Sequence, residues 1–264
     1  MKCRFIDTGL NDAYTNMAID ESILNCCEEP TLRVYQWSSP SISIGYNQNV
    51  KNEINLGACR KNGIKIVRRL TGGKAVLHEN DITYSFIVPE DKIPLPKDVV
   101  ESYRIIANAL VIALQRIGVN AQVMQQRERL KTPICFNSSN WYELTAKGKK
   151  ISGSAQRRLQ GKIMQHGPIL MDFDFEKNSR LFSLSNNSSD AKALADSLKK
   201  KITSIKHQLV IDISYREMAS AIKHGFQENF GFKFMDETLT KREAMLSEKL
   251  RSQKYSTDSW NFRT

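Results

Sequence analysis

The sequence predicts an α/β or α+β fold, with one domain built on a central mixed or mostly antiparallel β-sheet flanked by helices. Strand-like runs come first along the chain, and segments with helical spacing of apolar residues fall between and after them. No internal repeat and no long linker divides the sequence. Its 264 residues can bury a large core in one domain, or in one domain plus a small appendage.

The elements of the first part follow from caps, turns and periodicity. Residues 11–27 are predicted to form a helix, because Asn11 or Asp12 can cap it and apolar residues then fall roughly on one face. The runs 32–37 and 41–45 predict a strand pair across the turn at 38–40. In chain order, the next predicted elements are a helix over 49–62 and strands over 64–68 and 82–88.

The clearest helix comes next, after a proline-rich loop at 89–97. Its apolar residues recur at helical steps from Val99 to Ile117. The remaining predictions, in chain order, are a hairpin over 142–156 that turns at Gly148, a strand over 162–174, a polar loop over 176–190, a short basic helix over 191–200, an amphipathic helix over 215–230, and a highly charged end over 238–264 that is first helical and then loose.

Composition limits the location and the partners. Hydrophobic residues make up 41% and charged residues 25%, as in ordinary soluble globular proteins. No apolar run approaches the roughly 18 residues of a membrane helix, and the N-terminus lacks the apolar core of a signal peptide, so we expect a cytoplasmic protein. The net charge of +11 favours acidic partners, but Lys and Arg are spread along the chain. Composition therefore leaves both nucleic acid and an acidic protein open.

The cysteines and histidines show no metal-binding pattern. None of the five cysteines forms a CxxC, and no Cys/His cluster has zinc spacing. The odd count and the missing signal peptide argue against a disulfide framework. We therefore expect reduced, mostly buried thiols and no metal site.

Residues 66–88, IVRRLTGGKAVLHENDITYSFIV, are the most informative segment. Gly72 and Gly73 lack a Cβ and let the backbone approach a ligand closely, and Arg68 and Arg69 place positive charge beside them. This combination suits a site that grips an acyl or anionic group, although TGG between two strands can also be a plain hairpin turn. The segment is not a phosphate-binding P-loop, because the required Gly and Ser or Thr are absent around the GK pair.

Residues 135–172 contain a second cluster of candidate residues. Cys135 follows a proline in a polar loop, where a thiol is more accessible than on an apolar helix face. Lys150 lies at the edge of the predicted hairpin, and the small residues 152–155 leave room for a ligand beside it. Taken singly, Cys135 can be structural, Lys150 a solvated charge and His166 a hydrogen-bonded structural histidine.

Taken together, the two segments resemble the biotin/lipoate protein ligase superfamily over roughly residues 5–235. RRLTGGKAVLHENDITYS is similar to the family's arginine-plus-glycine loop. GKKISGSAQRR…QHGPILMDFD is similar to its lysine strand and the strand that follows. The resemblance implies a catalytic domain over 1–237, with a core at about 30–215, and a charged helical tail over 238–264.

Within the superfamily, the chain resembles the octanoyl-acyl-carrier-protein:protein N-octanoyltransferases. Their pattern has a basic residue in the glycine loop, here Lys74, and a cysteine 15 positions before a lysine, as Cys135 and Lys150 are. The resemblance implies that Cys135 is a nucleophile that forms an acyl thioester, and that Lys150 lowers the pKa of its thiol and contacts the oxyanion or acyl group. The substrate-binding residues that it implies are Arg68, Gly72, Gly73, His78, Gly153, Ser154 and Ala155, with no cofactor and no metal.

The same resemblance implies two protein partners. Octanoyl-acyl carrier protein would be the donor. A lipoyl-domain protein, such as the glycine-cleavage H protein or a 2-oxoacid dehydrogenase E2 subunit, would be the acceptor, with no role for nucleic acid or a membrane. Two alternatives stay open: an ATP-dependent lipoate-protein ligase on the same fold, and a basic nucleic-acid-binding protein. Indifference to the loss of Cys135 together with ATP dependence would support the first, and salt-sensitive nucleic-acid binding without acyl transfer the second.

Overall fold

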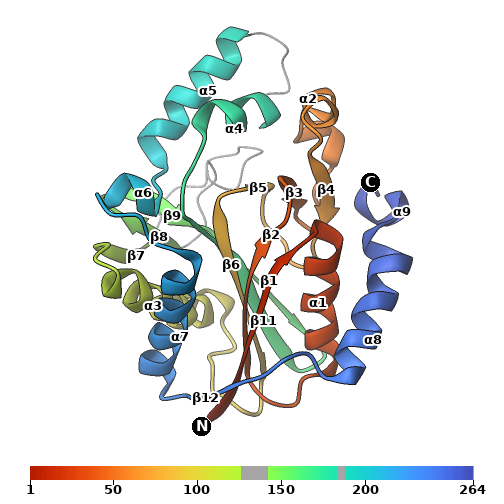
Figure 1. Ribbon diagram of the computed structural model, residues 1–264, viewed down its shortest axis with the longest axis vertical. Coiled ribbons are helices and arrows are strands. Elements are labelled where there is room, and N and C mark those ends of the chain that lie inside the picture. The colour runs from red at the N-terminus through yellow and green to blue at the C-terminus, as the bar shows by residue number, and fades with distance from the viewer. Residues whose placement is uncertain (126–141, 183–187, 264) are drawn as a thin grey trace.

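A mixed β-sheet forms the centre of the molecule (Figure 1). The computed structural model describes residues 1–125, 142–182 and 188–263. Within these residues, nine strands make the sheet in the order β12-β1-β2-β6-β11-β9-β8-β7, and β10 pairs with β11. The strands are β1 (Lys2–Asn11), β2 (Thr31–Trp37), β6 (Asp81–Pro89), β7 (Ala121–Gln125), β8 (Tyr142–Ala146), β9 (Lys149–Ser152), β10 (Ala155–Leu159), β11 (Lys162–Leu170) and β12 (Lys233–Asp236).

Pairing in this sheet is mostly antiparallel. Only β1 pairs in parallel, with β2 on one side and β12 on the other. The longest pairing joins β6 to β11, from Pro89 opposite Lys162 to Asp81 opposite Leu170. Every residue of β6 is buried, as expected for a central strand that packs on both faces. The predicted mixed sheet with flanking helices is therefore confirmed.

A second, smaller sheet holds the glycine-rich loop. It contains β4 (Lys65–Arg68), β3 (Ser41–Ile44) and β5 (Val76–His78), with β3 parallel to β4 and antiparallel to β5. The predicted pairing of 32–37 with 41–45 is wrong. Both segments are strands, but β1 and β6 already occupy the two hydrogen-bonding edges of β2, so β3 pairs elsewhere.

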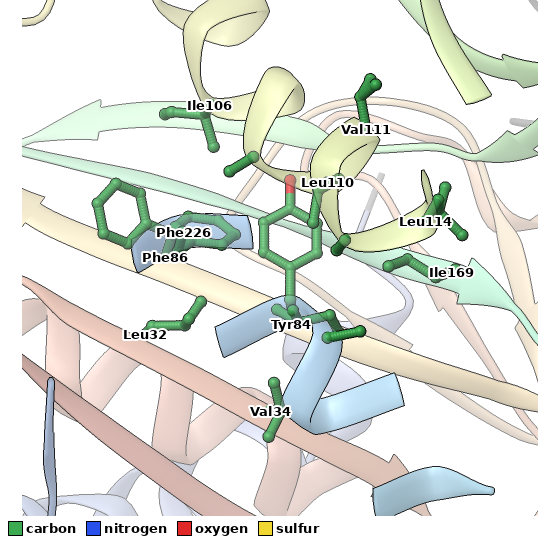
Figure 2. Packing of buried hydrophobic residues seen from close by; sticks show 14 of the residues in the cluster. Leu32, Val34, Tyr84, Phe86, Ile106, Leu110, Val111, Leu114, Ile169 and Phe226 are labelled. Atoms are coloured by element: carbon green, nitrogen blue, oxygen red, sulfur yellow. The ribbon is translucent and has the colours of Figure 1, made fainter. Parts of the chain in front are cut away.

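Two helices cover one face of the large sheet. They are α3 (Val99–Arg116) and α7 (Tyr215–Phe230), and they pack closely on each other. A Cβ at Gly225 would lie 2.1 Å from the carbonyl oxygen of Ala109, so this crossing requires a glycine. Figure 2 shows Leu110 of α3 and Phe226 of α7 packed around Tyr84 and Phe86 of β6. This core is the main apolar cluster of the molecule.

The opposite face is covered by α1 (Ala13–Cys26) and, outside it, α8 (Lys241–Leu250) (Figure 1). Asp12 caps α1, since its side chain accepts a hydrogen bond from the Thr15 N–H, as predicted. Ile19 and Ile23 of α1 pack against Ile87 of β6 and Met164 of β11. The central strands are therefore enclosed between two helical layers.

Two segments differ from the helix predictions. The expected helix over 49–62 is broken into a 3₁₀ turn, η1 (Val50–Asn52), and a short helix, α2 (Leu56–Lys61), each capped by its own asparagine. The expected polar loop over 176–190 contains α4 (Phe175–Phe182) and the start of α5 (Ser188–Lys201). The buried side chains of Leu181 and Phe182 stabilise α4, which the polar composition of the segment obscures. A single turn, α6 (Ile205–Gln208), follows α5.

The C-terminal segment is ordered to Arg263, which corrects the expectation of a loose end. After α8, a π-helical turn, η3 (Arg251–Tyr255), leads to a last short helix, α9 (Asp258–Asn261). Arg4 of β1 anchors the start of this segment through ion pairs with Glu237 and Glu243, at 2.8 and 2.7 Å. No helix among the described residues is both long and apolar enough to cross a bilayer, and a cytoplasmic location stays a prediction.

Candidate active site

A narrow pocket lies where the two sheets meet. Its walls come from α1, from β2, β6 and β11 of the large sheet, from β3 and β5 of the small sheet, and from the loops around Gly73 and Ser154. Its interior volume is about 30 Å³. That is room for roughly one or two water molecules. The pocket is therefore a tight site rather than an open groove.

Backbone contacts at two glycine pairs hold the walls together. A Cβ at Gly45 would lie 2.0 Å from the carbonyl oxygen of Gly73, and a Cβ at Gly167 would lie 2.1 Å from that of Gly153. Gly73 itself has a φ of +89°, a conformation that side chains other than glycine's rarely adopt. The glycine loop is therefore pressed onto the end of β3, and residues 153–155 are pressed onto β11.

The first polar group in the pocket centres on His78 of β5. Its Nδ1 lies 3.0 Å from Asp81 Oδ2, and its Nε2 lies 2.8 Å from the Ser43 hydroxyl. Trp37 stacks on the imidazole with ring centroids 3.9 Å apart. The imidazole, Ser43 and Asp81 are all buried, so this arrangement is fixed by packing as well as by hydrogen bonds.

The second polar group centres on His166 of β11. Its Nδ1 lies 3.0 Å from Asp20 Oδ2 of α1, and its Nε2 lies 2.7 Å from the Thr71 hydroxyl. Burial lowers the pKa of His166, and although Asp20 opposes this effect the net shift is downward. Burial alone would raise the pKa of Asp20, but Arg33 and His166 outweigh it and lower that pKa. A neutral imidazole beside an ionised carboxylate is therefore the stable state.

A chain of side-chain hydrogen bonds reaches the pocket from the α3 side. Gln165 donates to the Tyr84 hydroxyl at 2.9 Å, and Tyr84 donates to Ser154 at 2.8 Å. Burial raises the pKa of Tyr84, which therefore stays a donor. These contacts fix the side chain of Ser154 on the wall formed by residues 153–155.

The two neighbouring arginines have different environments. The guanidinium of Arg69 lines the pocket and donates to both oxygens of Ser43 and to the carbonyls of Gly72 and Lys74. Arg68 is not among the lining residues. It donates to six main-chain carbonyls, three in the segment after β3 and three in the C-terminal segment, those of Gly45, Tyr46, Gln48, Trp260, Asn261 and Arg263.

Lys150 of β9 forms a buried ion pair. Its Nζ lies 2.9 Å from Glu143 Oε1 of β8, and both side chains are less than a tenth exposed. The backbone carbonyl of Lys150 also accepts a hydrogen bond from the Thr203 N–H at 2.9 Å. The lysine is therefore positioned from two sides. Cys135 lies outside the described residues.

Comparison with known proteins identifies the family. A family model for the lipoyl protein ligase A/B catalytic domain matches residues 12–227. The chain is 38% identical to octanoyltransferase LipM of Halalkalibacterium halodurans, and the match covers 98% of both chains. It is 35% identical to octanoyltransferase LipM of Bacillus subtilis, with the same coverage. The chain is a LipM-type member of the lipoyl protein ligase A/B family.

Solved structures of the lipoyl protein ligase A/B family share the fold. A bipartite lipoate protein ligase of Thermoplasma acidophilum, studied with its E2 lipoyl domain, superposes with a TM-score of 0.84 at 26% identity, over 99% of this chain and 96% of that one. A structure of lipoate-protein ligase A bound with ATP gives a TM-score of 0.83 at 26% identity, over 99% of each chain. These ligases are less similar in sequence to this LipM-type chain than the octanoyltransferases are.

The pocket of this LipM-type chain contains most of the residues that the sequence pointed to. Five of the seven predicted substrate-binding residues line it, and Arg68 and Gly72 do not. How the seven contact a substrate stays a prediction, as do the roles of Cys135 and Lys150. The five lining residues are Gly73, His78, Gly153, Ser154 and Ala155.

Three of the four cysteines that the structure describes have the features of structural thiols in this LipM-type chain. Cys3, Cys27 and Cys59 are buried, and burial raises the pKa of all three thiols, those of Cys27 and Cys59 to about 11. Such thiols are protonated at neutral pH and are poor nucleophiles. Among residues 1–125, 142–182 and 188–263, no cluster of three or more His, Cys, Asp or Glu side chains could hold a metal ion.

Sequence reasoning missed several polar residues of the site. Ser43 and the carboxylates Asp20 and Asp81 were not identified as site residues, and neither was Glu143 beside Lys150. Arg69 was noted as a positive charge beside the glycine pair but was not among the predicted substrate-binding residues. A detectable signal existed for Asp81, because it follows His78 by three residues and opens a strand. Asp20 had no such signal, since its partner His166 lies far along the chain. Glu143 lies in the predicted hairpin with Lys150, but its contact with the lysine depends on the register of the two strands.

Proposed function

We propose that this chain is an acyltransferase that moves an octanoyl group from octanoyl-acyl carrier protein to a lysine of a lipoyl-domain protein, through a thioester on Cys135. Similarity to curated octanoyltransferases at 35–39% identity over 98% of the chain carries the proposal. A glycine-cleavage H protein and a 2-oxoacid dehydrogenase E2 subunit are both suitable acceptors. The ATP-dependent ligase and the nucleic-acid-binding protein are not favoured.

The chemistry of the pocket supports acyl transfer. Its walls combine apolar side chains with a fixed cation, Arg69, and the hydroxyls of Ser43 and Ser154, a mixture that suits an acyl chain with a polar carbonyl end. A pocket that holds roughly one or two water molecules is small for an eight-carbon chain, so we expect lining side chains to move when the chain binds. Met17 is the most adaptable of them.

In the first half-reaction, the Cys135 thiolate attacks the carbonyl carbon of the donor thioester. A C–S bond to Cys135 forms, and the carrier protein leaves as a thiol after taking up a proton. To the buried ammonium of Lys150 we assign the stabilisation of the thiolate and of the oxyanion. In the second half-reaction, the acceptor lysine attacks the acyl-enzyme and forms a stable amide.

A transfer assay without ATP tests the proposal. Purified chain is mixed with octanoyl-carrier protein and a lipoyl domain in buffer that contains apyrase, and the mass of the lipoyl domain is followed. We expect octanoylation by the native chain and none by Cys135→Ala. Transfer that needs ATP and octanoate and survives Cys135→Ala would instead establish a ligase.

A further inference from the structure

The hydrogen bonds around Ser43 have a defined direction. Because Nδ1 of His78 faces the Asp81 carboxylate at 3.0 Å, the imidazole proton belongs on Nδ1. Nε2 of the neutral ring is then an acceptor, and the Ser43 hydroxyl at 2.8 Å donates to it. The guanidinium of Arg69 donates to the same hydroxyl oxygen at 3.1 Å. The serine therefore points its proton at a base, while a cation polarises its oxygen.

The Asp81 end of this series of hydrogen bonds can stabilise a positive charge on His78. Asp81 Oδ2 also accepts a hydrogen bond from Thr83 at 2.7 Å, and Trp37 donates to Thr83 at 2.9 Å. The other carboxylate oxygen, Asp81 Oδ1, is buried without a hydrogen-bond partner among the described residues. The carboxylate thus keeps unused capacity to stabilise an imidazolium at His78.

The proposed reaction requires a proton acceptor at its second step. A lysine amine that attacks a thioester must lose a proton to become an amide, and a neutral imidazole is a suitable base near pH 7. Arg69 lines the pocket but is a permanent cation. His166 also lines it, yet its Nε2 is directed at Thr71, which is not a lining residue.

We propose that Ser43 and His78, oriented by Asp81, form a proton relay that deprotonates the acceptor amine, a role that rests on the octanoyltransferase function proposed above. Both Ser43 and His78 line the pocket, so the hydroxyl can meet an incoming amine. The arrangement is the one by which a buried carboxylate and an imidazole activate a hydroxyl group elsewhere. Here the hydroxyl passes a proton on instead of attacking.

The bonds balance as follows. The bond between the lysine Nζ and the octanoyl carbonyl carbon forms, and the C–S bond to Cys135 breaks with its electron pair going to the sulfur. The amine gives a proton to Ser43 Oγ as the Ser43 hydroxyl proton moves to His78 Nε2. The imidazolium, paired with Asp81, then returns the proton to the Cys135 thiolate or to solvent.

The two half-reactions can be measured separately. Octanoyl-enzyme is formed with excess donor, desalted and mixed with a lipoyl domain, and both steps are followed by intact mass. Ser43→Ala, His78→Gln and Asp81→Asn are compared with Ser85→Ala, which removes a buried hydroxyl of β6 that has no partner among the described residues and does not line the pocket. We expect the second step to slow by about 100-fold or more in His78→Gln and Asp81→Asn. Acyl-enzyme formation should slow far less than the second step in these variants, and Ser85→Ala should match the native chain in both steps.

Two further readouts separate a relay from a merely structural role. When the base is lost, the midpoint of the pH–rate profile of the second step should rise toward the pKa of the acceptor lysine, near 10. The charged and titratable groups around His78 in this pocket are Asp81, Arg69, His166 and Tyr35, and all four are retained in His78→Gln. Hydroxylamine is a much weaker base than lysine, and its nitrogen loses the proton to water more readily after attack. Deacylation by hydroxylamine should therefore slow far less in the octanoylated His78→Gln variant than attack by lysine does.

The outcomes are distinct. Equal slowing of both half-reactions, or of lysine and hydroxylamine alike, would overturn the relay while leaving octanoyl transfer in place. A second step at the native rate in all three variants would overturn it in the same way. Failure of the native chain to form an octanoyl adduct on Cys135 would overturn the proposed function and the relay together.

Discussion

At the residue scale, the buried pair of Lys150 and Glu143 determines how the lysine can act. Their charged atoms are 2.9 Å apart, and both side chains are almost fully buried. A buried ion pair gains little net stability, but removal of one partner leaves an uncompensated charge in an apolar setting. The pair therefore fixes the position of Lys150 more than it stabilises the fold.

A double-variant cycle should show that the ion pair matters more for the position of Lys150 than for the stability of the fold. We expect Glu143→Leu to lower the free energy of unfolding by about 3 kcal/mol, and Lys150→Met/Glu143→Leu to recover most of that loss. The double variant should still fail in octanoyl transfer, because the ammonium is absent. Urea unfolding and the ATP-free transfer assay measure the two effects. A double variant that loses as much stability as the two single variants combined would show that the pair is not coupled.

His166 gives a pH-dependent contribution to stability. Its pKa is lowered in the folded chain by burial, so between the folded and unfolded pKa values the unfolded chain binds more protons. Stability contributed by the neutral imidazole is present above pH 6.5, the ordinary histidine value, and falls as the pH drops below it. In urea unfolding at pH 7.5 and 5.5, the native chain should lose more stability on acidification than His166→Gln. Identical losses would show that the histidine does not titrate as stated.

At the element scale, the C-terminal segment supports the glycine loop. The Asn261 side chain of α9 accepts from the Arg68 N–H at 2.8 Å and donates to the Tyr255 carbonyl at 2.7 Å. Arg68 in turn ties Trp260 and Arg263 to Gly45, which lies against Gly73. Hydrogen bonds from the side chains of Asn261 and Arg68 to main-chain groups thus connect α9 to the pocket wall.

Removing this anchor should weaken the whole segment. Asn261→Ala leaves two buried backbone groups without partners, and we expect a loss of about 1–3 kcal/mol in the free energy of unfolding. Limited proteolysis should then cleave after α8 sooner than in the native chain. Ser259→Ala, at an exposed position of the same helix, is the matched control and should change neither result. Native resistance to proteolysis in Asn261→Ala would contradict the anchoring role.

Element prediction from the sequence succeeded where local patterns are strong. The apolar periodicity of α3 and α7 and the cap of α1 were sufficient to place these helices. The strand β1 was missed, and β2 and β3 were paired wrongly, because strand pairing depends on which edges other strands occupy. Within the site, the glycine loop and residues 153–155 were found through motifs. Asp20 reaches His166 only through the tertiary fold, and the contact of Glu143 with Lys150 depends on the register of the β8–β9 hairpin.

At the scale of the whole molecule, the net charge of +11 suits the acidic protein donor that we propose. Acyl carrier proteins are small and acidic, so long-range attraction can speed encounter before the thioester enters the pocket. Attraction of this kind is screened by salt, with a Debye length of about 8 Å at physiological ionic strength. Chemistry inside a buried pocket is screened far less.

The effect of salt on the reaction rate should therefore distinguish docking of the donor protein from the chemical step. At low donor concentration, transfer from octanoyl-carrier protein should fall as salt rises from about 0.05 to 0.5 M. Acylation by a small neutral octanoyl thioester should barely change, since it needs no protein contact. Initial rates with the two donors provide the comparison. Equal salt sensitivity would mean that the net charge has no part in donor recognition.

Passage of the octanoyl group through Cys135 can be detected by the mass of the acyl-enzyme. The chain is mixed with octanoyl-carrier protein without acceptor, quenched in acid, weighed intact and then mapped by peptide mass. We expect a single octanoyl adduct on the peptide that contains Cys135, lost on addition of a lipoyl domain as the domain gains the same mass. An octanoylated lipoyl domain that forms while the chain never carries the adduct would contradict the account.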